Sequence, residues 1–125
     1  MEKTKLFLLL GAVLSGLGVA IGAFGAHGLK NMVTPDRLIV FETAVRYQMY
    51  HALALLLIGT TLLHTPTLAL AKVGYCFLAG MVLFSGSLYA LVLTNTPWLG
   101  AITPLGGVAF ILGWALLAWE LWKSL

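Results

Sequence analysis

The stretch from Leu6 to Ala26, LFLLLGAVLSGLGVAIGAFGA, carries no charged residue. An α-helix rises 1.5 Å per residue, so a run of this length crosses a hydrocarbon core about 30 Å thick. Its small residues recur every three or four positions and form one seam along a helix: Gly11, Ser15, Gly18, Gly22 and Gly25. Small residues let lipid-immersed helices approach closely, so we interpret this seam as a helix-packing surface.

Three further apolar runs follow the first one. The four runs are Leu6–Ala26, Tyr47–Leu63, Leu68–Leu93 and Ile102–Trp119. Each approaches the roughly 20 residues of a membrane-spanning helix, and only short connections separate them. The sequence therefore predicts an all-α fold, an integral membrane four-helix bundle, with residues 1–125 as a single membrane domain. In the last run Gly106 and Gly113, with Ala109 between them, repeat the small-residue spacing.

The composition supports the same class. Hydrophobic residues make up 61% of the chain and charged residues 9%, with a mean hydropathy of +1.02. Soluble domains are roughly 45–50% apolar and about 25% charged. The net charge of +3 comes from basic residues scattered singly at the ends of apolar runs. We therefore expect the lipid bilayer, and not nucleic acid, as the surroundings of this chain.

Three of the predicted helices open with a Thr-Pro dipeptide, at Thr34-Pro35, Thr65-Pro66 and Thr103-Pro104. Threonine accepts a hydrogen bond from an unpaired N–H at a helix N-terminus, and proline at the first position needs no donor. The pattern predicts that three helices begin at these dipeptides.

The N-terminus has two interpretations. Lys3 and Lys5 followed by an apolar stretch resemble a secretory signal peptide, with cleavage near Gly25. The apolar run continues to spanning length, however, which favours a retained first helix.

The distribution of basic residues predicts an orientation. An even number of spans places both termini on one side, together with Lys72 and Lys123, and the other side carries Lys30, Arg37 and Arg46. Under the positive-inside rule we expect cytoplasmic termini, with Trp98 at the outer interface and Trp119 and Trp122 at the inner one.

The second run opens with a polar stretch, RYQMYHALALL, from Arg46 to Leu56. Glu42, Arg46 and Tyr50 follow one another at i, i+4 spacing, so we expect an ion pair between Glu42 and Arg46. One interpretation is an interfacial ion pair with a belt of tyrosines that only orients the helix. The other is a functional site at the membrane boundary.

Further polar residues are expected at the same level, at the end of the first helix and in the outer half of the third. The candidate binding cluster comprises His27, Glu42, Arg46, Tyr47, Tyr50, His51, Ser85, Ser87 and Tyr89. Such groups suit a shallow water-filled cavity or a polar head group. His27 and His51 also suggest a metal or haem pair, but no second ligand stands at helical spacing. We therefore predict no metal and no cofactor, with haem or metal binding as the least favoured alternative. The few separated acids give catalysis little support.

Five segments, in order, carry a resemblance to a known family: GAFGAHGL from Gly22, YQMYHALALL from Tyr47, FSGSLYAL from Phe84, ITPLGG from Ile102 and GWALLAW from Gly113. The chain closely resembles the membrane family called domain of unknown function 423, whose animal relatives are called transmembrane protein 256. The resemblance spans essentially the whole chain. It implies a small protein of the bacterial inner membrane with about four helices, and it supplies no reaction, cofactor or catalytic residue.

Two classes of function remain open from the sequence. The first is a structural or assembly protein, not an enzyme, that binds itself or another membrane protein through its glycine seams. The second is a binding site for a small solute or lipid head group, or an oligomeric transporter or channel, at the Arg46 side. We favour the first because the chain lacks charges deep in its apolar runs.

Overall fold

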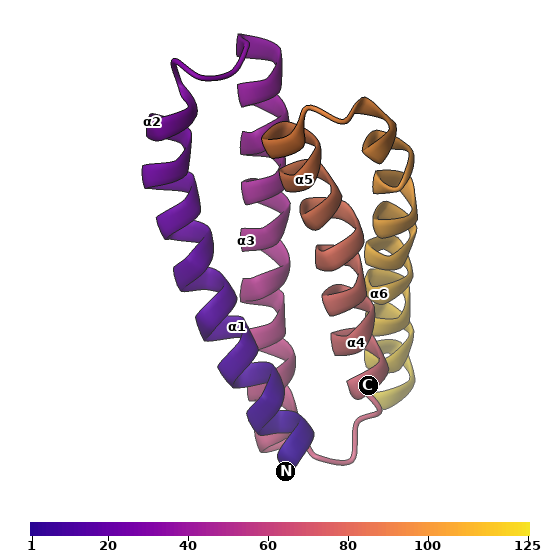
Figure 1. Ribbon diagram of the computed structural model, residues 1–125. Coiled ribbons are helices and arrows are strands. Elements are labelled where there is room, and N and C mark those ends of the chain that lie inside the picture. The colour runs from indigo at the N-terminus through magenta and orange to yellow at the C-terminus, as the bar shows by residue number, and fades with distance from the viewer.

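The computed structural model describes residues 1–125 as four helical rods without strands (Figure 1). The first rod comprises α1 (Glu2–Ala20), the π-helical η1 (Ile21–Gly25) and α2 (Ala26–Leu29), and the second is α3 (Pro35–His64). The third comprises α4 (Ala71–Gly80), the π-helical η2 (Met81–Gly86) and α5 (Ser87–Thr94). The fourth comprises the 3₁₀ turn η3 (Pro97–Ala101) and α6 (Thr103–Ser124). The all-α four-helix fold is confirmed.

Three rods are long and apolar enough to cross a membrane: Glu2–Leu29, Ala71–Thr94 and Pro97–Ser124. The helix α3 is long enough but not apolar enough to be one of these spans, although the sequence predicts a span at Tyr47–Leu63. Its polar residues lower its hydropathy, and two of them, Gln48 and His51, are buried among the other helices. A helix surrounded by protein can carry such groups because neighbouring helices supply their hydrogen-bond partners.

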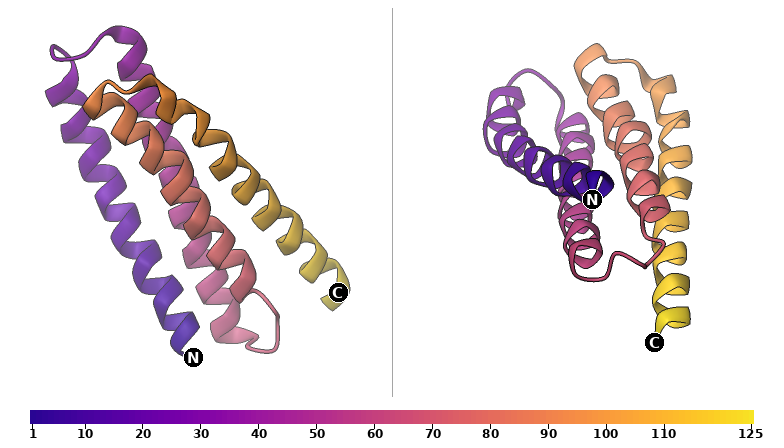
Figure 2. Two further views of the ribbon diagram at one scale, coloured as in Figure 1. Left: turned by 45° about the vertical axis from the view of Figure 1, so that its right-hand side comes forward. Right: turned by 90° about the horizontal axis from the view of Figure 1, so that it is seen from below.

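The helix α3 occupies the centre of the packing. It contacts α1 along its length on one side and α4, η2 and α5 on another, while α6 packs on α4 and η2 (Figures 1 and 2). The main core joins Phe7 of α1, Leu55 and Ile58 of α3, and Phe77 of α4, all of which are almost fully buried.

The glycine seam of α1 is directed at α3 within the same chain. A Cβ atom at Gly11 would lie 2.9 Å from the carbonyl oxygen of Ala52, and one at Gly22 would lie 2.9 Å from Val45. Gly18 and Gly25 likewise abut α3 side chains, those of Met49 and Phe41, and Ser15 has a buried hydroxyl without a partner. In α6, Gly106 abuts the backbone of Phe84 and Gly113 abuts Phe77. These seams hold the bundle together and are covered by it, so they are not free to bind another molecule.

The three Thr-Pro dipeptides that were predicted to begin helices differ from one another in the structure. The Thr34 hydroxyl accepts a hydrogen bond from the Arg37 N–H at 3.3 Å, so α3 begins as predicted. The prediction at Thr65-Pro66 is wrong, because the Thr65 N–H bonds the Thr61 carbonyl at 2.7 Å and ends α3, and α4 begins only at Ala71. The helix α6 does begin at Thr103, but the Thr103 hydroxyl is hydrogen-bonded to Ser87 and does not cap the helix.

Both termini lie at one end of the bundle, which we call the terminal end (Figure 1). Here Glu120, although nearly buried, accepts from Lys72 at 2.6 Å and lies 3.2 Å from Lys123. The opposite end carries the connections 30–34 and 95–102, and we call it the loop end.

Candidate functional site

Gln48 connects three helices inside the bundle. Its Nε2 donates to the Leu14 carbonyl of α1 at 2.9 Å, and its Oε1 accepts from the Tyr89 hydroxyl of α5 at 2.6 Å. Gln48 is not a member of the cluster predicted from the sequence. Its spacing of three residues from His51 is the signal that would have placed it on the inward side of α3.

His51 has a partner at both ring nitrogens. Trp114 Nε1–H donates to His51 Nε2 at 3.0 Å, and His51 Nδ1 lies 2.8 Å from the Tyr47 carbonyl. An indole N–H only donates, and a carbonyl only accepts. The Nδ1 atom therefore carries the hydrogen and the ring is neutral. The ring also stacks on Phe110, with centroids 3.5 Å apart, so an aromatic ring covers one of its faces.

Two serines join the third rod to its neighbours. The buried Ser85 hydroxyl donates to the Ala44 carbonyl of α3 at 2.7 Å, and Ser87 lies 2.7 Å from the Thr103 hydroxyl of α6. Together with Gln48 and His51, they give each helix at least one polar contact with another. These interhelical bonds pair the polar groups of a mainly apolar interior and leave little hydrogen-bonding capacity for a ligand.

The predicted cluster is divided by the structure into two groups. Tyr47, His51, Ser85, Ser87 and Tyr89 lie wholly or partly inside the bundle, whereas His27, Glu42, Arg46 and Tyr50 are exposed on its outside. The expected ion pair between Glu42 and Arg46 is not formed, since both ion pairs of the structure are made by Glu120. Both side chains of the expected pair face outward.

His27 and His51 do not form a ligand pair. His27 is exposed, and His51 is buried with both nitrogens engaged. No group of three or more His, Cys, Asp or Glu residues is arranged to hold a metal ion.

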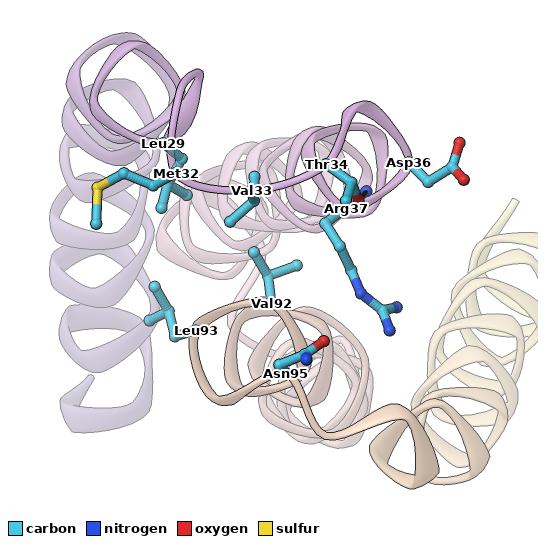
Figure 3. Close-up of a pocket in the computed structure, with 9 residues that line it drawn as sticks. All are labelled: Leu29, Met32, Val33, Thr34, Asp36, Arg37, Val92, Leu93 and Asn95. Carbon is cyan, nitrogen blue, oxygen red and sulfur yellow. Dashed lines mark hydrogen bonds between the residues drawn. The ribbon is translucent and has the colours of Figure 1, made fainter.

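The larger hollows lie at the two ends of the bundle. At the loop end a pocket of about 670 Å³ lies between the end of α2, the start of α3 and the end of α5 (Figure 3). A second, of about 430 Å³, lies at the terminal end beside Lys3 and Lys72. Beside Gln48 there is only a groove of about 190 Å³ with an almost wholly apolar surface.

Comparison with known proteins agrees with this architecture. The family described as protein of unknown function DUF423 matches residues 21–107. The chain is 50% identical to the UPF0382 membrane protein SAB0533 of Staphylococcus aureus (strain bovine RF122 / ET3-1), over 90% of this chain and 92% of that protein. It is 46% identical to the UPF0382 membrane protein YwdK of Bacillus subtilis (strain 168), over 90% of this chain and 93% of that protein. No solved structure matches.

These relatives are membrane proteins of nearly the same length, and the family match runs from η1 through α3, α4, η2 and α5 to the start of α6. The chain belongs to the family of membrane proteins described as protein of unknown function DUF423.

Proposed function

We propose that this protein is a structural or assembly protein of the bacterial inner membrane, without enzymatic activity, that acts through its lipid-facing surfaces. The observation that carries the proposal is the closed interior. Gln48 and His51, the most polar groups in the middle of the bundle, bond to other groups of the chain. A group that is already paired is a poor ligand or proton carrier, because a substrate would have to replace an existing bond.

A conduit through a single subunit has little support. Intramembrane charges usually mark the path of an ion or proton. Here the nearly buried charge is Glu120, which is neutralised by lysines at the terminal end. The exposed Arg46 and Glu42 do not converge on a cavity. A transporter pathway between subunits remains the alternative, and it too requires self-association.

The outward side of α1 offers a surface for association. Ala12, Gly16, Ala20 and Ala23 are exposed and recur at spacings of four, four and three. A Cβ atom at Gly16 would meet nothing within 4 Å. Small residues spaced in this way allow close approach of a second helix in a membrane. We place the contact with a second copy of the chain here, because the other row of small residues on α1 is occupied by α3.

We further propose that the termini are cytoplasmic. Lys3, Lys5, Lys72 and Lys123 belong to the terminal end, whereas Lys30 and Arg37 belong to the loop end and Arg46 lies in the half of α3 nearer to it. Reporter fusions after Lys30, Pro66, Trp98 and Leu125 test this orientation. An external C-terminus would contradict it.

The experiment that tests the assembly proposal is native mass spectrometry of the gently purified protein, which reports the number of subunits. Gly16→Leu is expected to reduce the oligomer to a monomer, since the larger side chain keeps the helices apart. Gly107→Leu is the matched control. The space beside Gly107 is also open, but Gly107 belongs to α6 and not to the proposed contact surface on α1. A wild-type protein that is monomeric in both detergent and nanodiscs would refute self-association.

A further inference from the structure

The loop-end pocket combines an apolar wall with a polar rim. Five of its nine lining residues are hydrophobic, and they come from both sides of the gap, with Leu29 at the end of α2 and Leu93 at the end of α5. The polar lining residues are Thr34, Asp36 and Arg37 at the start of α3 and Asn95 after α5 (Figure 3). An amphipathic ligand fits such a pocket better than a wholly polar one.

Arg37 is the cationic group of the pocket. Its half-buried side chain extends from α3 toward the end of α5, while the neighbouring Asp36 points away from it (Figure 3). Its guanidinium makes no ion pair and no hydrogen bond with the protein, in contrast to Lys72 and Lys123, which pair with Glu120. A guanidinium presents five donors in a planar fork that matches the oxygens of a phosphate group.

Two neutral donors complete the rim. Asn95 adopts the left-handed conformation, with φ of 51°, and its backbone N–H bonds the Leu91 carbonyl, so the residue ends α5. Its carboxamide forms no hydrogen bond with the protein. The Thr34 hydroxyl accepts from the Arg37 N–H and keeps its own hydrogen for another acceptor.

We expect the pocket to lie at the depth of lipid head groups. Trp98, 66% exposed, follows α5 at the same end, and tryptophan is enriched where a membrane meets water. Lys30 lies in the other connection of the loop end and adds positive charge. A free phosphate ion would make no use of the apolar wall, whereas a lipid places its phosphate at the rim and its acyl carbons against Leu29 and Leu93.

We propose that the loop-end pocket binds an anionic phospholipid, with Arg37 and Asn95 donating to its phosphate group and the apolar wall holding the start of its acyl chains. This site is separate from the outward face of α1 on which the assembly proposal depends. Lipid binding and subunit number are measured independently, so either proposal can fail without the other.

The test is native mass spectrometry of the protein in mild detergent, titrated with phosphatidylglycerol, with phosphatidylcholine, and with inorganic phosphate. Phosphatidylglycerol is expected to be retained as a stoichiometric adduct. Arg37→Gln is expected to weaken its retention by about tenfold or more, as for loss of a charge-assisted hydrogen bond. Arg46→Gln is the matched control, because Arg46 is also an unpaired arginine of α3 but lines no described pocket.

Asn95→Gly provides a second variant that keeps the fold, since glycine adopts the left-handed conformation without strain. It is expected to weaken phosphatidylglycerol retention by a few fold. Equal losses from the changes at Arg37 and Arg46 would overturn the proposal, as would equal retention of phosphatidylcholine. Displacement of the lipid by millimolar inorganic phosphate would assign the site to a soluble anion and overturn the lipid assignment.

Discussion

Trp114 of α6 donates its indole N–H to the imidazole Nε2 of His51 on α3 at 3.0 Å, between residues 63 positions apart in the chain. The indole is 44% exposed on the outer face of α6, whereas His51 is 3% exposed. An aromatic side chain on the lipid-facing surface thus completes the hydrogen bonding of a buried histidine.

We expect Trp114→Phe to lower the free energy of unfolding by about 1–3 kcal/mol, because it leaves a buried acceptor without a partner. The control is Trp98→Phe, which changes an exposed tryptophan whose indole N–H makes no hydrogen bond with the protein. Unfolding in detergent, followed by circular dichroism, measures both variants. Equal stabilities of the two variants would contradict the role of the bond.

Gln48 and Tyr89 form the second long-range pair, and a double-mutant cycle tests their coupling. Tyr89→Phe leaves the Gln48 carbonyl oxygen unpaired, and Gln48→Leu leaves the Tyr89 hydroxyl unpaired. We expect the two single changes to sum to more than the double change, by about 0.5–3 kcal/mol, since contacting residues are not additive. Additive changes in the free energy of unfolding would show that the two side chains are not in contact.

Gly106 and Gly107 are neighbours in α6 with opposite surroundings. A Cβ atom at Gly106 would collide with the backbone of Phe84, which cannot rotate away, and one at Gly107 would meet nothing within 4 Å. Gly106→Ala is expected to destabilise the bundle by about 1–3 kcal/mol through overpacking. Gly107→Ala is expected to be neutral or stabilising, because alanine favours a helix over glycine. Melting temperatures in detergent distinguish the two, and the reverse order would show that α6 is rotated.

Glu42 and Arg46 should not be coupled, although their i, i+4 spacing predicted an ion pair. The structure places both on the outside of α3 without a bond between them. We expect Glu42→Gln and Arg46→Gln to be additive within about 0.5 kcal/mol in a double-mutant cycle of unfolding. A larger coupling energy would show that the interfacial ion pair forms.

Helix formation and fold class were predictable from the sequence because they depend on local properties. The uncharged run Leu6–Ala26 must satisfy its backbone internally within a bilayer, and a helix does so without neighbours. The start of α3 was predictable for the same reason, since the Thr34 hydroxyl accepts from an N–H only three residues along the chain, that of Arg37. The start of α4 was not predictable, because the Thr65 N–H bonds the Thr61 carbonyl at the end of α3. Whether such a residue ends one helix or begins the next depends on where the preceding helix stops.

The candidate site was only partly predictable. Helical periodicity grouped Glu42, Arg46 and Tyr50 on one side of α3, but it did not show which side of α3 faces the other helices. The rotation of α3 depends on which of its residues meet the glycines of α1, such as Ala52 against Gly11. That choice is made by packing between helices, and it turned the charged residues outward.

The sequence by itself thus determined a membrane protein with four helices, because hydropathy and backbone hydrogen bonding act within one segment. Only the tertiary structure decided that the α1 seam faces α3, that Trp114 and Tyr89 pair with His51 and Gln48, and that Arg37 stands unpaired over a pocket. These relationships join residues that are distant in the chain. They depend on the close fit of particular side chains, which no single segment specifies.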